Sequence, residues 1–282
     1  MAVIKAGKHV YNEKPLTVKL AEATTMLDAA KQANVRVGCA PGTFLGAGLQ
    51  TCRRVIDDGV IGRPVAATAF MMGHGHESWH PDPEFYYKAG GGPLMDMGPY
   101  YLTALISLLG GIQRVRGMAE ITEEERTITS EPKKGQKIKV ETPDHVAGSI
   151  EFANGAIGTI ITSFATWHGS YPAIQIFGTE GTLTVPDPNS LTGPVYVQGA
   201  HEKERREIPL THPHNERDKW GIGVVEMAYA IRENRPHRAS GDLAAAVLAA
   251  MHGILDSSKD GLARDLGGAP DRPAALPTDF AV

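Results

Sequence analysis

Two short segments carry side chains suited to proton transfer. Lys14 stands in Glu13-Lys14-Pro15, directly after a strand-like stretch, and sites in α/β folds gather at the carboxyl ends of strands. Asp96 and Tyr100 lie four residues apart in an apolar stretch with helical spacing. Tyrosine has an ordinary pKa of about 10, but a neighbouring cation stabilises its phenolate. A lysine close to Tyr100 could therefore make it an acid or base, whereas Asp96 could equally cap a helix.

Several aromatic and histidine side chains offer contacts for a sugar. The segment 73–80 holds three histidines and Trp79, whose flat face suits a pyranose ring, while His80 could donate or accept a hydrogen bond. Tyr101 and His168 are further candidates for substrate contact, with a core aromatic and a structural histidine as the alternatives. We predict no metal site, because the histidines lie in a glycine-rich loop without nearby cysteines.

The hydrophobic pattern predicts a strand, helix, strand, helix order in the first 62 residues. Apolar stretches predict strands ending near residue 10 and spanning 35–38, and apolar residues at helical spacing predict helices near 20–30 and 49–56. This order is typical of a parallel α/β unit.

Beyond residue 62 strands dominate. Strong helical patterns cover 95–109, 219–233 and 241–258, and the tail from residue 262 is rich in Pro, Ala and Gly and predicted to be irregular. Strands are predicted at 65–71, 146–152, 157–164, 174–176, 183–185, 195–197 and 208–210. Asn154-Gly155 predicts a hairpin with a type I′ turn, in which both residues have positive φ. The charged segment 122–139 is expected to be an exposed loop or an excursion at the sheet edge.

Four motifs resemble those of the Gfo/Idh/MocA family, named after glucose–fructose oxidoreductase and inositol dehydrogenase. They occur in the family's order, at plausible spacing: Glu13-Lys14-Pro15, Asp57-Asp58-Gly59-Val60-Ile61-Gly62, Gly90-Gly91-Gly92-Pro93-Leu94-Met95-Asp96-Met97-Gly98 and Gly178-Thr179-Glu180-Gly181. The resemblance implies an α/β plus α+β fold. Residues 1–62 would be the remnant of an NAD(P)-binding Rossmann domain. Residues 63–282 would form a substrate-binding and oligomerisation domain with an open, mostly antiparallel sheet flanked by helices.

The resemblance also implies a function and a site. The family transfers hydride between NAD or NADP and a CH–OH group of a sugar, cyclitol or related polyol. By motif position Lys14, Asp96 and Tyr100 would be catalytic, and Glu13, Lys14 and Pro15 would contact the cofactor. The hypothesis is that Lys14 lowers the pKa of Tyr100, which exchanges the proton, while Asp96 orients the site. The antiparallel sheet would join copies of the chain into a homo-oligomer.

Two departures from the family pattern open an alternative. No Gly-x-Gly-x-x-Gly precedes Glu13, so the expectation is a chain shortened at its N-terminus, with Met1 an internal methionine of a longer protein. Tyr100 and Thr103 occupy positions where the family has histidine and a second aspartate. The alternative function is a non-catalytic carbohydrate-binding or interaction subunit. The choice between NAD and NADP stays open, because the residue that reads the ribose would precede Glu13.

Composition restricts the partners. The net charge of −4 gives no electrostatic footprint for nucleic acid or an anionic membrane, and no apolar run reaches membrane-spanning length. Two cysteines, Cys39 and Cys52, give no disulfide framework and suit a reducing compartment. We therefore expect a cytoplasmic protein with a small-molecule substrate.

Overall fold

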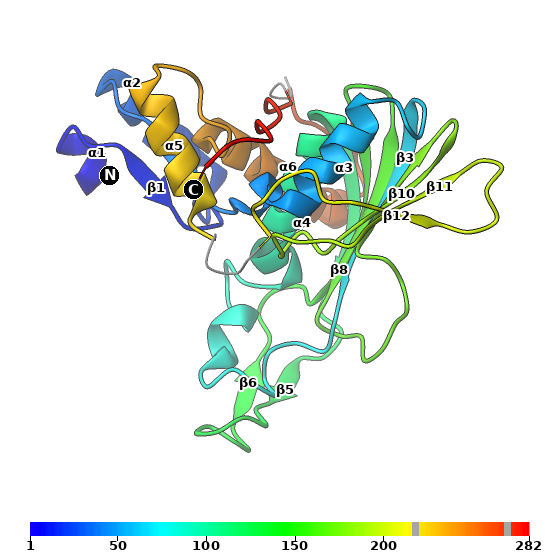
Figure 1. Ribbon diagram of the computed structural model, residues 1–282. Helices are drawn as coiled ribbons and strands as arrows, with labels where there is room; N and C mark the ends of the chain where they lie inside the picture. Colours follow the sequence, from blue (N-terminus) through cyan, green and yellow to red (C-terminus); the bar gives the residue numbers. More distant parts are fainter. Residues whose placement is uncertain (216–219, 268–271, 282) are drawn as a thin grey trace.

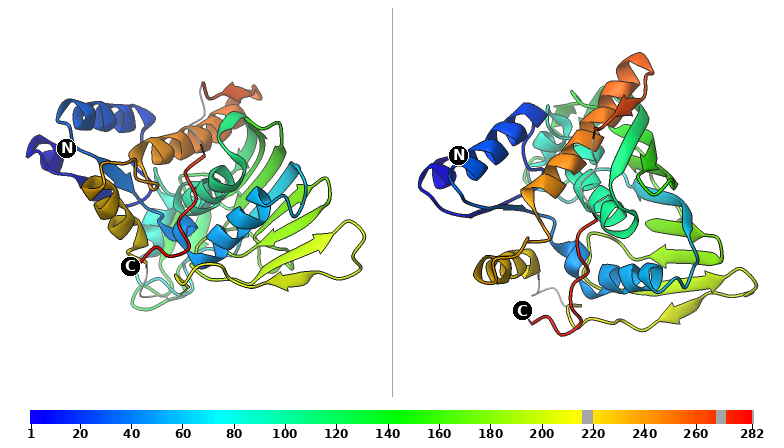
Figure 2. Two further views of the ribbon diagram at one scale, coloured as in Figure 1. Left: turned by 45° about the horizontal axis from the view of Figure 1, so that its top comes forward. Right: turned by 90° about the horizontal axis from the view of Figure 1, so that it is seen from above.

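The computed structural model describes residues 1–215, 220–267 and 272–281. These residues form three layers: a nine-stranded sheet, helices on one face of that sheet, and a small parallel unit beyond the helices. The view from above in Figure 2 shows this order, with the blue N-terminal segments and the green and yellow sheet on opposite sides of the helices. The predicted α/β plus α+β class is confirmed.

The small unit combines segments from both halves of the chain. Its first elements are α1 (Ala2–Lys5), β1 (Val10–Asn12), α2 (Leu20–Gln32) and β2 (Val37–Cys39). β1 and β2 pair in parallel, with Val10 opposite Val37. Helix α5 (Ile222–Arg232) packs against β2. The predicted strand, helix, strand, helix order is present as β1, α2, β2 and α3 (Ala47–Asp57), although α3 packs on the nine-stranded sheet. Residue 219 of the helix predicted at 219–233 lies outside the described residues.

The large sheet is mostly antiparallel, as predicted. Its strands follow the spatial order β12-β11-β10-β9-β3-β8-β7-β4-β13, and only β3 and β8 pair in parallel among them. Their bounds are β3 (Pro64–Met72), β4 (Ile112–Glu120), β7 (His145–Phe152), β8 (Ile157–Ser163), β9 (Ile174–Gly178), β10 (Gly181–Val185), β11 (Val195–Gly199), β12 (Arg206–Ile208) and β13 (Arg264–Asp265). Strand β4, at the end of the sheet next to β13, was not predicted.

The hairpin between β7 and β8 is present, but its turn differs from the prediction. Gly155 alone has a positive φ, of 84°, so the turn is not type I′. The Gly155 N–H donates to the Phe152 carbonyl at 2.9 Å, and the Asn154 side chain accepts from the Ala156 N–H. Asn154 therefore stabilises the turn through its side-chain oxygen and not by adopting a left-handed backbone conformation.

Helices cover one face of the sheet. The covering helices are α3 (Ala47–Asp57), α4 (Pro93–Leu109) and α6 (Gly241–Asp260). The short helix η1 (Thr43–Leu45) packs on α3 and α4, and η2 (Pro83–Tyr87) packs against β6 (Lys137–Lys139). α6 packs on β4, α4 on β3, β7 and β8, and α3 on β10 and β11. Leu102, Leu105 and Ile160 are among the apolar residues buried between the layers. Helix α4 begins with Pro93, whose missing N–H costs nothing at a helix start.

The charged segment 122–139 is a separate two-stranded ribbon and not a loop. Strands β5 (Glu125–Thr127) and β6 (Lys137–Lys139) pair antiparallel and project from the bottom of the molecule in Figure 1. Ile128 and Ile138 are buried in a small second core with Phe164. The charged residues that predict exposure lie on the outer face of the ribbon, whereas the residues of its inner face are buried.

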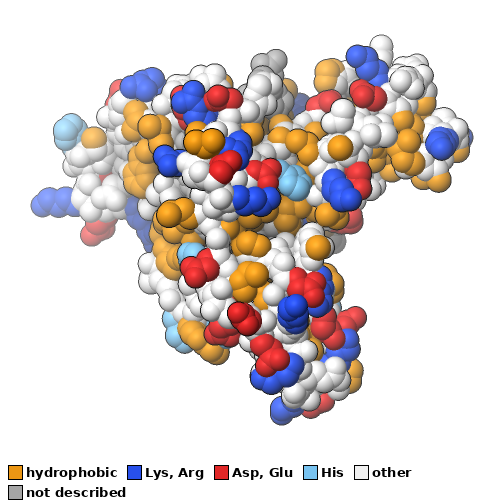
Figure 3. All heavy atoms as spheres, turned by 180° about the vertical axis from the view of Figure 1, so that it is seen from behind, with side chains coloured by type: hydrophobic (Ala, Val, Ile, Leu, Met, Phe, Trp, Pro, Cys, Tyr) orange, Lys and Arg blue, Asp and Glu red, His pale blue; other side chains and the backbone are white. Residues whose placement is uncertain are grey.

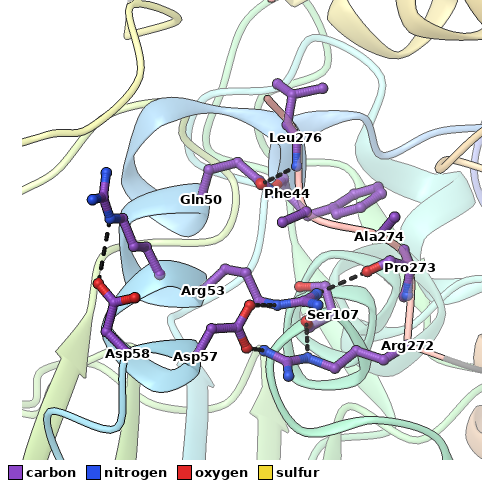
Figure 4. Close-up of polar contacts among 12 residues, drawn as sticks. Phe44, Gln50, Arg53, Asp57, Asp58, Ser107, Arg272, Pro273, Ala274 and Leu276 are labelled. Atoms are coloured by element: carbon purple, nitrogen blue, oxygen red, sulfur yellow. Dashed lines mark hydrogen bonds and ion pairs between the residues drawn. The ribbon is translucent and has the colours of Figure 1, made fainter. Parts of the chain in front are cut away.

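The C-terminal tail is irregular apart from β13, and its residues 272–281 lie along the helical layer. Figure 4 shows this docking onto α3. Arg272 forms an ion pair with Asp57 at 2.7 Å, and Arg53 donates to the Pro273 carbonyl at 2.8 Å. The Leu276 N–H donates to the Gln50 side chain, and Leu276 itself is buried. The tail is therefore part of the packed fold.

The boundary between the two predicted domains stays a prediction. α3 precedes residue 62, yet it packs on α4, β10 and β11. None of the described helices is long and apolar enough to cross a lipid bilayer.

Candidate active site

Lys14 and Asp96, 82 residues apart in the sequence, meet where β1 ends and α4 begins. Lys14 Nζ lies 2.7 Å from Asp96 Oδ1 and also donates to the Asp96 carbonyl oxygen at 2.8 Å. The two side chains are 17% and 16% exposed, so water screens the pair only partly. Gly92 occupies the N-cap position of α4, and the Asp96 carboxylate binds Lys14. The alternative of Asp96 as a helix cap is therefore wrong.

The glycines before α4 allow this approach. Gly92 has a φ of 87°, and a Cβ there would lie 2.8 Å from the Pro143 carbonyl oxygen. A Cβ on Gly91 would lie 2.6 Å from the carbonyl oxygens of Phe85 and Tyr86. The turn at 90–92 therefore needs glycine, and it brings η2 against the first turn of α4.

Tyr100 lies beside this pair, but its predicted electrostatics are wrong. Lys14 Nζ is 5.3 Å from the centroid of the Tyr100 ring. Burial, together with the negative charges of Glu13 and Asp96, raises the pKa of Tyr100 to about 12. The Asp96 carboxylate offsets the Lys14 charge, so the cation does not stabilise a phenolate. Tyr100 is a neutral phenol at this site.

A histidine that the sequence analysis did not assign to the site completes the cluster. His76 Nε2 lies 3.5 Å from Asp96 Oδ2, so the two oxygens of Asp96 face Lys14 and His76. Burial lowers the pKa of His76, and the Asp96 charge opposes that effect. The signal in the sequence is the histidine-rich loop 73–80, whose residue types also suit metal binding and sugar contact.

A buried ion network fixes the loop that carries His76. Glu77 Oε1 accepts from Arg126 Nη1 at 3.0 Å, and Arg126 Nη2 donates to Asp144 Oδ2 at 2.9 Å. The Tyr87 hydroxyl donates to the other oxygen of Glu77. All four side chains are buried. Ribbon β5–β6 supplies Arg126, so this ribbon holds the loop after β3 in place.

The other predicted substrate residues fall into two groups. Trp79 is 63% exposed, with its ring centroid 5.2 Å from that of His76, and His80 lies edge-on to Trp79. Tyr101 is buried in the main core, which is the alternative left open for it. His168 is exposed, and no contact joins it to Lys14 or Asp96 in the described part of the chain.

The residues present fit one end of a dinucleotide and not its pyrophosphate. Glu13, Lys14 and Pro15 follow β1, and the Glu13 carboxylate accepts from the Lys14 N–H at 3.0 Å. In α/β folds, dinucleotides bind at such carboxyl ends of parallel strands. The glycines after β2 leave no cradle, because a Cβ on Gly46 or Gly48 would lie 2.6 or 2.2 Å from backbone atoms of residues 191–192. These glycines pack against the chain itself.

Comparison with known proteins gives relatives that are named as dehydrogenases or reductases of sugars and cyclitols. Levoglucosan dehydrogenase of Pseudarthrobacter phenanthrenivorans is 28% identical over 200 residues, which cover 65% of this chain and 50% of that protein. The 1,5-anhydro-D-fructose reductase of Ensifer adhaerens is 30% identical over 187 residues, 65% of this chain and 51% of that protein. Myo-inositol 2-dehydrogenase of Thermotoga maritima is 25% identical over 184 residues, with 65% and 51% coverage. The chain spans about half the length of these curated relatives.

Solved structures share the fold. An NAD binding oxidoreductase from Klebsiella pneumoniae superposes with a TM-score of 0.79 at 23% identity, covering 95% of this chain and 76% of that one. Levoglucosan dehydrogenase in complex with NADH and levoglucosan gives a TM-score of 0.76 at 23% identity, with 95% and 76% coverage. At this identity the likeness establishes the fold alone.

Two models of a single family match successive parts of the chain. The oxidoreductase family model with the NAD-binding Rossmann fold matches residues 1–40, and the GFO/IDH/MocA C-terminal domain matches residues 49–184. Together they span more than half of the sequence, in the family's order. The chain therefore belongs to the Gfo/Idh/MocA family of oxidoreductases.

Proposed function

We propose that this protein is an NAD- or NADP-linked dehydrogenase that acts on a CH–OH group of a sugar, cyclitol or related polyol. The observation that carries the proposal is the Lys14–Asp96 pair, at the end of a strand that pairs in parallel, in a chain of this family. The relatives named for levoglucosan, 1,5-anhydro-D-fructose and myo-inositol support a carbohydrate or cyclitol substrate.

In the proposed site, some residues stabilise charge and others position the reacting groups. When bound, an oxidised nicotinamide supplies the acceptor for the hydride that leaves the alcohol carbon. The Lys14 ammonium attracts the hydroxyl oxygen and stabilises negative charge that develops there, while Asp96 holds that ammonium in place. Tyr100 donates a hydrogen bond as a neutral phenol. Glu13 and Pro15 border the nicotinamide end.

A hollow beside the helices supports a polyol as the substrate. A cavity of about 690 Å³ is lined by Asp187, Asn189 and Trp220, among others. The Asp187 charge raises the pKa of both Tyr100 and Tyr101. Asn189 Oδ1 is buried without a partner among the described residues. Carboxylate, amide and indole groups together suit hydroxyls and a sugar ring, with Trp79, His80 and His168 as further proposed contacts.

The second candidate is a carbohydrate-binding or interaction subunit without turnover. Gly46 and Gly48 pack against residues 191–192 and form no pyrophosphate cradle. In either case we propose that a second copy of the chain pairs through the open face of the sheet. The cytoplasmic location stays a prediction.

Titration calorimetry and an activity screen separate the two candidates. We expect the protein to bind NADH or NADPH in the micromolar range, and to reduce NAD⁺ or NADP⁺ with levoglucosan, myo-inositol or D-xylose. Sugar binding without nicotinamide binding would establish the binding subunit instead. A folded sample that binds neither would overturn both candidates.

A further inference from the structure

The two carboxylate oxygens of Asp96 face two different side chains. Oδ1 holds Lys14 at 2.7 Å, and Oδ2 faces His76 Nε2 at 3.5 Å. His76 comes from the loop after β3, whereas Lys14 follows β1 and Asp96 begins α4. Three separate segments therefore converge on one carboxylate, which makes an ordered row of ammonium, carboxylate and imidazole.

We propose that His76 is the catalytic residue that exchanges a proton with the substrate hydroxyl, in the role that the sequence assigned to Tyr100. This inference rests on the proposed dehydrogenase function and names its acid–base group. In alcohol oxidation the hydroxyl proton passes to the imidazole, while the hydride of the same carbon leaves for an oxidised nicotinamide, so a carbonyl forms. In the reverse direction the imidazolium returns that proton to the oxygen.

The geometry leaves one nitrogen of His76 for this exchange. Nδ1 is buried without a hydrogen-bond partner among the described residues, so it is closed to a substrate. Nε2 lies 3.5 Å from Asp96 Oδ2, which is longer than an ordinary N–H···O bond of about 2.7 to 3.2 Å. Nε2 is therefore not committed to Asp96. In the proposed mode of binding, the substrate oxygen contacts both Lys14 Nζ and His76 Nε2, which lie against the two oxygens of the same carboxylate.

The ring is held in place before any substrate arrives. The His76 imidazole stacks on Tyr86, with centroids 3.7 Å apart and planes 10° from parallel, and meets the edge of Phe164. The next residue, Glu77, is anchored in the buried network with Arg126. A preset ring orientation is what a proton-transfer group needs, because proton transfer depends on distance and direction.

The surroundings suit a base at neutral pH. Burial lowers the pKa of His76 below its ordinary 6.5, and the positive charges of Lys14 and His80 act in the same direction. The negative charges of Asp96 and Glu77 oppose this shift. The Tyr86 phenol stays neutral, because burial and Asp96 raise its pKa. At pH 7 His76 is therefore a neutral imidazole that can accept a proton. Tyr100, with a pKa of about 12, still carries its own proton and cannot accept another.

The first test needs no cofactor. NMR titration of the histidine imidazoles in the full chain should give His76 a pKa below 6.5. Asp96→Asn should lower that pKa further, because it removes a negative charge, and Lys14→Met should raise it. His212, whose pKa burial lowers and which lies outside this cluster, should keep its pKa in both variants. If neither substitution changes the pKa of His76, the proposed interaction of Lys14, Asp96 and His76 is wrong.

The second test is kinetic. His76→Gln should lower kcat for alcohol oxidation by about 10²- to 10⁴-fold, the usual share of general acid–base catalysis, and abolish the fall in rate at acid pH. His74 lies two residues earlier in the loop and stacks on Trp167. The variant His74→Gln should keep the wild-type kcat and the fall in rate at acid pH. Circular dichroism and thermal melting of each variant would verify folding.

The outcomes separate the inference from the function beneath it. A wild-type enzyme that turns over while His76→Gln keeps its rate and pH profile would overturn His76 alone. If Tyr100→Phe instead removes the acid limb, Tyr100 carries the proton after all. A wild-type chain that neither binds nicotinamide nor turns over would overturn the dehydrogenase itself, and with it this role for His76.

Discussion

At the residue scale, Lys14 is the group on which the proposed chemistry depends. Lys14→Met should lower kcat/KM by about 10²- to 10³-fold, because it removes the charge that stabilises the developing oxyanion. The variant should also lose about 1 to 3 kcal/mol of stability, since Asp96 keeps a partly buried charge without its ammonium partner. Steady-state kinetics and urea unfolding measure both effects.

Lys5→Met is the matched control, because Lys5 is an exposed lysine of α1 close in sequence. It should leave both kcat/KM and stability unchanged. Equal losses in the two variants would show that general charge, and not the pair with Asp96, matters. Full activity in Lys14→Met would contradict the role given to Lys14.

The residues of this site were predictable where they belong to a local motif. Lys14 and Asp96 follow from their places in Glu13-Lys14-Pro15 and in the helix start, and the structure brings them together. The pKa of Tyr100 was not predictable, because it depends on burial and on how Asp96 divides its contacts. His76 lies twenty residues before Asp96 on another element, so no spacing in the sequence reveals their contact.

At the scale of elements, ribbon β5–β6 braces the loop that carries His76. Arg126→Met should destabilise the protein by about 3 to 5 kcal/mol, because it leaves Glu77 and Asp144 charged and buried without their partner. Hydrogen exchange should rise most in residues 73–80. Chemical unfolding and mass-spectrometric exchange measure the two effects.

The control uses a charge on the outside of the same ribbon. Figure 3 shows acidic and basic side chains crowded together on this extension. Lys134→Met removes one exposed charge there and should change stability by less than about 0.5 kcal/mol. If Arg126→Met leaves exchange in 73–80 unchanged, the ribbon does not brace the loop.

Elements with a strong period were predictable from sequence, and those fixed by tertiary contacts were not. Helix α4 and the β7–β8 hairpin follow from long apolar patterns. The ribbon was missed because two three-residue strands carry no measurable alternation, and their inner face is defined by Arg126 and a small second core. Strand β4 was not predictable because a bulge between Ile112 and Arg114 interrupts the alternation and its buried position 117 is a glycine.

At the scale of the whole molecule, the sheet has one covered face and one open face. Among the described residues no helix packs on the face that carries Met118 and Ile157, which are 79% and 62% exposed. The central cross-strand row of this face is Arg116, Ser149, Thr159, Thr68, Gln175 and Thr184, in which only the first residue is charged. Such a surface is flat and poor in charge, which suits an isologous contact with a second copy.

We predict that the open face closes a dimer. Light scattering after gel filtration should give a mass of twice 30.2 kDa, and the double substitution Met118→Glu with Ile157→Glu should reduce it to that of the monomer. The introduced carboxylates would be buried in the contact between copies, where a charge that loses its water without gaining a partner is costly. Val224→Glu on α5, half exposed and away from the sheet, should leave the dimer intact. A wild-type monomer at micromolar concentration would contradict the dimer, and a dimer that survives the double substitution would place the contact between copies elsewhere on the molecule.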